Sequence, residues 1–124
     1  MGDTTATVLV VDDQPEIRKL VTAMLSRRGY IVLSAESELE ALRLLEQNPA
    51  IGLVLADVVT GKSTGVEIGA KLVAIRRDLK VLLMSGYDRE SLAERYGVKV
   101  DTPILTKPFT MAQLDAAVTA VLAG

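Results

Sequence analysis

Polar residues that could do chemistry follow four of the apolar, β-branched runs in this sequence, directly after each run ends. They are Asp12, Asp13, Asp57, Ser85 with Gly86, and Lys107. The chain contains no Cys and no His, which excludes thiolate chemistry, Cys-type zinc sites and the commonest general base. Any chemistry must therefore use carboxylates, hydroxyls, lysine or the backbone.

Three carboxylates brought to one place repel one another unless a cation neutralises them. Oxygen ligands suit Mg²⁺, with Mn²⁺ as the alternative. A carboxylate such as Asp57 can also attack phosphorus, while a metal and the Lys107 ammonium neutralise the phosphoryl oxygens. Ser85 offers a neutral donor to such an oxygen, and Gly86 lets the backbone approach closely. The set therefore predicts a divalent-metal site with phosphoryl chemistry.

The elements that must position these residues alternate along the chain. Strands are predicted at 7–11, 31–35, 52–56, 80–84 and 103–106, and helices at 15–28, 37–47, 64–77, 89–96 and 111–122. Strands that are apolar on both faces and separated by helices indicate a parallel sheet covered on both sides, with right-handed crossovers. The expected fold is α/β, a (βα)5 domain over residues 1–124.

Local signals support the helix starts. Ser37 and Glu40 have the spacing of a capping box, Thr64 and Thr110 are N-cap residues, and Pro15 suits a first turn. Functional groups of an open α/β sheet gather at the carboxyl ends of its strands. The polar set is therefore expected to meet at one edge of the sheet.

Composition excludes several classes of function. The net charge is −2 with scattered Lys and Arg, so no basic face for nucleic acid is predicted. No apolar run approaches the ~20 residues of a membrane span, and residues 1–7 lack the basic flank of a secretory signal. A cytoplasmic protein is expected. The chain ends directly after the fifth helix, so no output domain is predicted.

Four segments together resemble the receiver domains of two-component response regulators, the CheY-like superfamily. They are Val-Val-Asp-Asp (10–13), Leu-Ala-Asp (55–57), Leu-Met-Ser-Gly-Tyr (83–87) and Thr-Lys-Pro-Phe (106–109). The resemblance covers essentially the whole chain and implies a doubly wound, flavodoxin-like, five-stranded parallel sheet of strand order 2-1-3-4-5. The last two segments resemble the receivers of hybrid kinases somewhat more. A stand-alone regulator and a part of a longer protein both stay open.

The resemblance implies a role for each residue of the site. Asp57 would be the phosphoacceptor, and Asp13 and Asp57 would bind Mg²⁺ directly. Asp12 would act on the metal largely through water, and the backbone carbonyl of Val59 would complete the protein ligands. By the same resemblance, Lys107 would form an ion pair with the phosphoryl group and the hydroxyl of residue 85 would donate to it.

The resemblance also implies partners. The donor would be a phosphohistidine on a sensor histidine kinase or histidine phosphotransfer protein, because a chain without His cannot be its own donor. The chain would be a signalling phosphoacceptor rather than an enzyme, assisting its own Mg²⁺-dependent phosphorylation and dephosphorylation. Phosphorylation would change the face formed by residues 89–96 and 103–122, and it is compatible with a phosphorylation-dependent homodimer. Ile17 and Leu20 would lie on the kinase-docking surface, although both could equally belong to the core.

Two positions depart from the family pattern. Receivers often continue after the acceptor with Met-Pro-x-Met-x-Gly, whereas residues 60–65 are Thr-Gly-Lys-Ser-Thr-Gly, which predicts a more mobile loop. Ile104 occupies the place of the aromatic residue that many receivers rotate on activation. We hypothesise that Tyr87 carries the switch instead or shields the acyl phosphate from water.

Other readings of the same residues remain. A degenerate receiver that binds partners without phosphorylation is the main alternative. A haloacid-dehalogenase-like phosphatase needs a second Asp where Val59 stands, and two carboxylates after the first strand would repel the phosphate of a flavin. The cationic side chains near helix ends are expected to be solvated and without function; they are Arg27, Arg28, Lys71, Arg76 and Arg77.

Overall fold

A computed structural model describes residues 6–99 and 102–124 of the chain as a parallel sheet covered by helices on both faces. The five strands are β1 (Thr7–Val11), β2 (Ile31–Ala35), β3 (Ile51–Asp57), β6 (Lys80–Ser85) and β7 (Ile104–Thr106). They lie in the order β2-β1-β3-β6-β7, with every neighbouring pair parallel. This order confirms the predicted arrangement 2-1-3-4-5.

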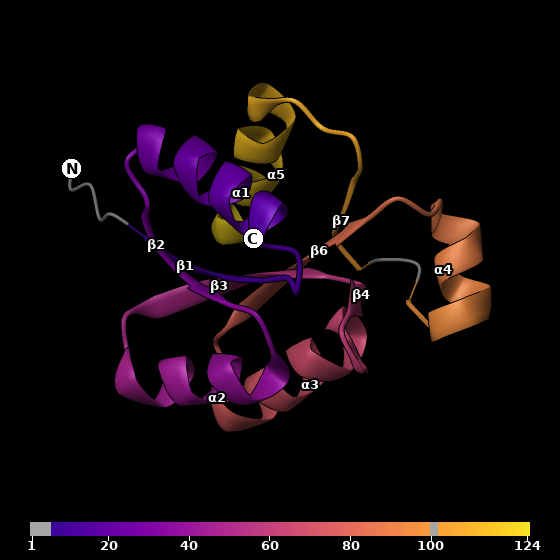
Figure 1. Cartoon of the computed structure of the whole chain (residues 1–124), viewed down its shortest axis with the longest axis horizontal. Helices are drawn as coiled ribbons and strands as arrows, with labels where there is room; N and C mark the ends of the chain where they lie inside the picture. Colours follow the sequence, from indigo (N-terminus) through magenta and orange to yellow (C-terminus); the bar gives the residue numbers. More distant parts are fainter. Residues whose placement is uncertain (1–5, 100–101) are drawn as a thin grey trace.

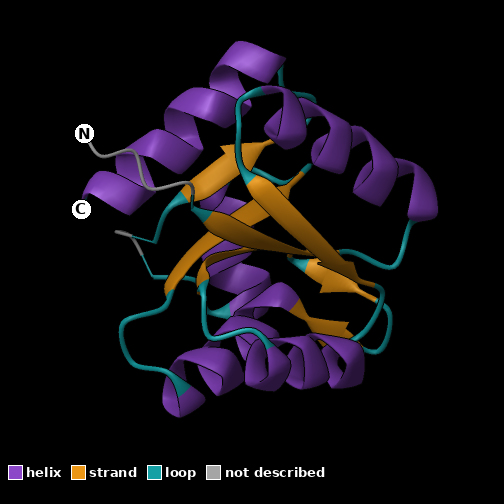
Figure 2. Cartoon of the chain, turned by 90° about the vertical axis from the view of Figure 1, so that its left-hand side faces the viewer, coloured by secondary structure: helices purple, strands orange, loops and turns teal. Residues whose placement is uncertain are grey.

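The helices form two layers around this sheet. They are α1 (Pro15–Arg27), α2 (Glu38–Gln47), α3 (Gly65–Ile75), α4 (Arg89–Tyr96) and α5 (Met111–Ala123). Figure 1 shows α1 and α5 together on one face and α2 and α3 together on the other, with α4 standing apart at the side of the molecule. The view in Figure 2 shows the sheet enclosed between the two helical layers.

The core is split by the sheet because successive strand side chains point to opposite faces. In β1, Val8 and Val10 pack with the residues of α1 and α5, whereas Leu9 and Val11 pack with those of α2 and α3. All four are fully buried. This two-sided burial explains why the strands appear in the sequence as continuous apolar runs.

Helix starts follow the predicted caps with one difference. Thr64 and Thr110 each form a complete capping box with the residue three positions later. The Ser37 hydroxyl accepts the Glu40 amide at 3.2 Å, but the Glu40 carboxylate accepts from Glu36 instead of returning to Ser37. The capping box predicted there is therefore only half formed, and Ser37 is the cap rather than the first residue of α2.

The segment after Asp57 contains a hairpin that was not predicted. Strands β4 (Val59–Thr60) and β5 (Ser63–Thr64) pair antiparallel. Gly61 forms their turn at a φ of +58°, a conformation that glycine adopts without steric cost. The greater mobility predicted for this loop stays a prediction, while the conformation itself is a hydrogen-bonded turn.

Arg76 was predicted to be a solvated end of the third helix, and that prediction is wrong. Helix α3 ends at Ile75, and Arg76 takes an extended conformation with φ of −133°. Its guanidinium donates to the backbone oxygens of Leu45 at 2.6 Å and Ile51 at 2.8 Å. Arg76 thus satisfies carbonyls that the end of α2 leaves unpaired and joins α2, β3 and α3.

Two other cations from the same prediction also have partners. Lys71 pairs with Glu38 at 2.8 Å, and Arg28 lies 3.7 Å from Asp115. Both lysine and arginine side chains are largely exposed, so these contacts contribute little to stability.

None of the described helices has the length and apolar character needed to cross a membrane. Residues 1–5, which belong to the segment where no secretory signal was predicted, lie outside the described residues.

Candidate functional site

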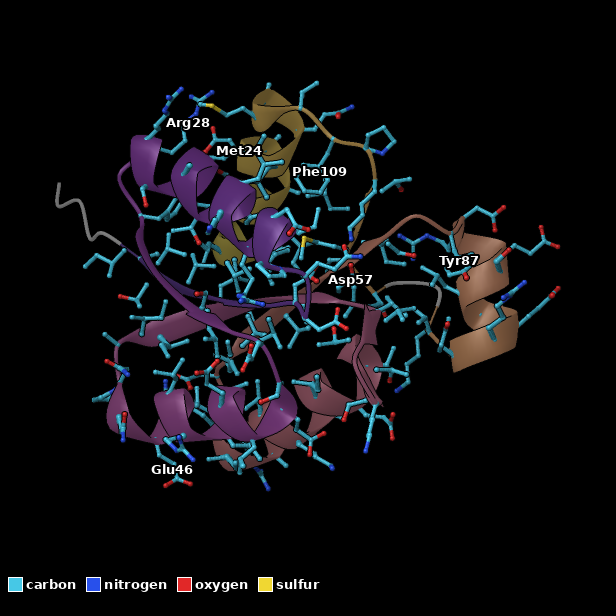
Figure 3. The ribbon with its side chains drawn as sticks, in the orientation of Figure 1. Met24, Arg28, Glu46, Asp57, Tyr87 and Phe109 are labelled. Atoms are coloured by element: carbon cyan, nitrogen blue, oxygen red, sulfur yellow. The ribbon has the colours of Figure 1, made fainter. Side chains whose placement is uncertain are left out.

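The predicted polar set lies at the carboxyl edge of the sheet. Asp12 follows β1, Asp57 and Ser85 are the last residues of β3 and β6, and Lys107 follows β7. Strands β1, β3 and β6 are neighbours in the sheet and β7 flanks β6, so these ends converge. Figure 3 labels Asp57 at this edge, beneath the start of α1. The structure thus brings Asp12, Asp57 and Lys107 together as predicted.

Asp12 is a fully buried carboxylate with an incomplete set of partners. One oxygen, Oδ1, accepts the Gln14 amide at 2.9 Å, whereas Oδ2 is buried and has no hydrogen-bond partner. Burial raises the pKa of Asp12 from its ordinary 3.8 to about 6, against the opposing effect of the Gln14 amide. The neighbouring Asp57 raises this pKa further, and Lys107 lowers it. An ionised Asp12 therefore lacks compensation in this site.

Asp57 is held in place through both its side chain and its backbone oxygen. Its Oδ1 accepts the Val59 amide at 2.8 Å, and its backbone oxygen accepts the Thr60 hydroxyl at 2.7 Å. Its Oδ2 forms an ion pair with Lys107. The side chain is 11% exposed, so a small reagent can reach the carboxylate while the hairpin fixes its position.

Gly65 is a site residue whose role the sequence analysis did not identify. A Cβ atom at this position would lie 2.4 Å from the backbone oxygen of Asp57, far inside van der Waals contact. The first turn of α3 can approach the end of β3 only because residue 65 has no side chain. The last glycine of the family segment compared above stands at this position, and that match was the available sequence indication.

Lys107 links the two buried carboxylates. Its Nζ pairs with Asp57 Oδ2 and lies 3.8 Å from Asp12 Oδ2. Its backbone amide donates to the backbone oxygen of Ser85 at 2.7 Å. The Lys107–Pro108 peptide bond is cis. The resemblance implied an ion pair between Lys107 and a phosphoryl group, which stays a prediction, and the structure shows the same ammonium paired with Asp57.

Asp13 and Val59 lie at the margin of the site. Asp13 is exposed and its Oδ2 accepts the Gly61 amide at 3.1 Å, which directs that carboxylate toward the hairpin. Among residues 6–99 and 102–124, no three acidic side chains are grouped closely enough to hold a metal ion by themselves. The metal-ligand roles of Asp13 and of the Val59 carbonyl stay predictions.

The residues present nevertheless fit a hard divalent cation. The unpartnered Oδ2 of Asp12 is a buried anionic oxygen beside a second carboxylate, Asp57. Mg²⁺ keeps several waters and needs only one or two protein carboxylates. A cation in this position would satisfy the oxygen that the protein leaves without a hydrogen bond.

Ser85 is buried at the end of β6, and its hydroxyl oxygen accepts the Tyr87 amide at 2.9 Å. A Cβ at the intervening Gly86 would meet open space, so no protein contact demands glycine there. The predicted close approach of the Gly86 backbone to a phosphoryl group stays a prediction. Ile104 is half-buried and packs against the core cluster on the α2 and α3 side of the sheet.

Comparison with known proteins shows the family of this chain. Residues 8–119 match the family described as the response regulator receiver domain. The chain therefore belongs to the receiver domain family of two-component response regulators. It is 32% identical over 118 residues to the sensor kinase CckA of Brucella abortus, covering 94% of this chain but 12% of CckA.

Two further relatives are similar over nearly their whole length. The response regulator receiver protein CpdR of Brucella abortus is 26% identical, with 86% of this chain and 88% of CpdR covered. The response regulator TrrA of Thermotoga maritima, solved in complex with Mg²⁺ and BeF, has a TM-score of 0.81 and 26% identity, covering 94% of this chain and 99% of TrrA. These likenesses confirm the predicted family and fold.

Proposed function

We propose that this receiver domain accepts a phosphoryl group on Asp57 from the phosphohistidine of a sensor histidine kinase or a histidine phosphotransfer protein. The observation that carries the proposal is the pair of buried carboxylates, Asp12 and Asp57, that share one ammonium group at the open edge of the sheet. One oxygen of Asp12 lacks any hydrogen bond. A purely structural edge has no use for such a costly arrangement.

Mg²⁺, when bound by Asp12, Asp13, Asp57 and the Val59 carbonyl, supplies charge neutralisation for the acidic residues and the phosphoryl oxygens. Mn²⁺ has the same ligand preferences and can substitute. Asp12 fits this role because its buried oxygen needs a cationic partner that Lys107, at 3.8 Å, supplies only weakly.

The transfer itself forms a bond between an Asp57 carboxylate oxygen and phosphorus. The bond from phosphorus to the donor histidine nitrogen breaks, and the nitrogen keeps the electron pair. The Val59 amide, 2.8 Å from Asp57 Oδ1, fixes the carboxylate during this step. Lys107 leaves its ion pair with Asp57 and follows the new negative charge on the phosphoryl oxygens. The Ser85 hydroxyl donates to one of those oxygens.

Intact mass after incubation with Mg²⁺ and a small phosphodonor tests the proposal. Acetyl phosphate is one donor, and phosphoramidate is a second because its bond from phosphorus to nitrogen resembles that of phosphohistidine. We expect one phosphoryl adduct that disappears in Asp57→Asn and without Mg²⁺. Asp78→Asn, an exposed aspartate at the opposite end of β6, is the matched control and should keep the adduct.

A folded wild-type chain without any adduct would overturn the proposal. The degenerate receiver, a module that binds its partner without phosphorylation, would then be the better reading. An adduct that persists in Asp57→Asn would contradict the assignment of the acceptor residue.

A further inference from the structure

The ring of Tyr87 is held against α4 from two sides. The guanidinium carbon of Arg95 lies 4.9 Å from the ring centroid, which is cation–π distance. The Tyr96 ring lies 6.3 Å away at an interplanar angle of 50°, a geometry typical of attractive aromatic pairs. Tyr87 is 38% exposed, and Figure 3 shows it beside α4, away from the sheet. These contacts fix a residue that solvent would otherwise leave free to rotate.

The backbone of the same residue holds the hydroxyl of the site. The Tyr87 amide donates to Ser85 Oγ at 2.9 Å, and only Gly86 separates the two residues. Gly86 is exposed and a Cβ there would meet open space, so the short link between Ser85 and Tyr87 is not packed against the core. Ser85 is buried in the sheet, while the ring of Tyr87 is bound on the helix. One residue therefore connects the sheet edge to α4.

The Tyr87 amide occupies one lone pair of the Ser85 hydroxyl oxygen and so sets the orientation of that side chain. Rotation of the Ser85 side chain toward the acceptor removes the oxygen from the Tyr87 amide. That amide lies in an exposed segment and can bond to water instead, so the exchange has a small net cost. Anything that holds Tyr87 in place favours the arrangement in which the Ser85 oxygen accepts the Tyr87 amide.

We propose that Arg95 is a positioning residue of the phosphoryl site, acting through Tyr87. By holding the Tyr87 ring on α4, Arg95 keeps the Tyr87 amide on Ser85 and the hydroxyl in the orientation that this amide sets. Phosphorylation draws Ser85 away, and the Tyr87 ring then leaves Arg95, so the exposed face of α4 gains an unpaired guanidinium. This inference rests on the proposed function, and it makes α4 the surface where the phosphorylated state differs.

Three variants test the contact. Arg95→Met removes the cation but keeps the aliphatic length, Arg95→Lys restores a cation, and Tyr87→Leu removes the ring. Arg43→Met, an exposed arginine on α2, is the matched control. Unfolding midpoints of all variants are compared first, and equal midpoints show that the fold is retained.

Two measurements follow. Without phosphodonor, the amide resonance of Tyr87 in ¹H–¹⁵N spectra should move in Arg95→Met and Tyr87→Leu toward the position of a water-exposed amide. With acetyl phosphate and Mg²⁺, the rate of phosphorylation should rise about two- to fivefold in both, the population change that an exposed cation–π contact can supply. Arg95→Lys should recover most of the wild-type behaviour, and the Tyr87→Leu/Arg95→Met double variant should show no further increase.

The outcomes separate the two proposals. A wild-type chain that takes no phosphoryl group refutes the proposed function, and the role of Arg95 falls with it. A wild-type chain that is phosphorylated, with Arg95→Met matching Arg43→Met in both rate and Tyr87 resonance, refutes the role of Arg95 alone. A slower Arg95→Met would also overturn it, because the contact would then favour the reactive arrangement.

Discussion

Replacing Asp12 by Asn should stabilise the metal-free protein at neutral pH. The pKa of the buried carboxyl is raised from 3.8 to about 6, so between about pH 4 and pH 6 the folded chain holds a proton that the unfolded chain releases. This folded-state preference for the protonated form means that stability falls as pH rises from about 4 to 6 and that the full cost is present above pH 6. At 1.36 kcal/mol for each tenfold change in proton affinity, the cost is roughly 3 kcal/mol.

Asn removes the charge and keeps the oxygen that accepts the Gln14 amide. Its new amide group must find an acceptor, with the Asp57 carboxylate nearby, so we expect about 1–2 kcal/mol of the cost to be recovered. Urea unfolding in the presence of a chelator measures this. With an m-value of about 2 kcal/mol/M, the midpoint should rise by about 0.5–1 M near pH 7 and change little near pH 4.

Asp13→Asn is the matched control, because Asp13 is exposed and its replacement should change stability by less than about 0.5 kcal/mol. Added Mg²⁺ should stabilise the wild type more than Asp12→Asn, since the cation supplies the partner that Asp12 Oδ2 lacks. A stabilisation of equal size at both pH values would refute the reasoning, because ionisation of Asp12 could not then be its cause. A destabilised variant near pH 7 would refute it as well.

Three further predictions concern the scaffold around the site. Gly65→Ala should lower the free energy of unfolding, measured by urea titration, by about 2–3 kcal/mol or displace Asp57, because its Cβ would lie 2.4 Å from the backbone oxygen of Asp57. Gly52→Ala should be nearly neutral in the same titration, because a Cβ at residue 52 would meet open space. Arg76→Met should lower the free energy of unfolding by about 1.5–3 kcal/mol, because it leaves the backbone oxygens of Leu45 and Ile51 without their donor. Arg77 is exposed, so Arg77→Met should lower it by less than about 0.5 kcal/mol. An equal loss in both variants would contradict the hydrogen bonds of Arg76. Mg²⁺ at a hundredfold excess over its Kd should raise the wild-type free energy of unfolding by about 2.7 kcal/mol. A urea unfolding midpoint that does not change when Mg²⁺ is added would argue against a metal site.

The sequence predicted the centre of the sheet well because burial on both faces makes β1 and β3 nearly continuous apolar runs. Thr7–Val11 illustrates this, since all five residues are buried. The hairpin after Asp57 was missed because strands of two residues are too short for any periodicity, and only Gly61 indicated a turn. The end of α3 was misplaced by two residues because nothing local reveals that Arg76 binds carbonyls of α2.

For the site, the sequence predicted which residues lie together but not all of the contacts between them. The rule that functional groups lie at the carboxyl ends of strands placed Asp12, Asp57 and Lys107 together correctly. Sequence could not show that Lys107 pairs with Asp57, because that contact depends on side-chain geometry between residues 50 positions apart. The close approach of Gly65 to Asp57 depends on how the start of α3 packs on the end of β3, and the sequence indicated it only through the last glycine of residues 60–65.

The strand order has a consequence for how the chain folds. Strands β2, β1 and β3 are neighbours and come from the first half of the sequence, so they can associate before the rest of the chain joins. This early unit carries Asp12 and Asp57 but not Lys107, which arrives with β7. A chain in which only these three strands had paired would hold the two acids without their cation, and docking of the last strand would relieve that repulsion. The Lys107 ammonium that neutralises the two carboxylates would thereby also favour docking of β7, the last strand of the sheet.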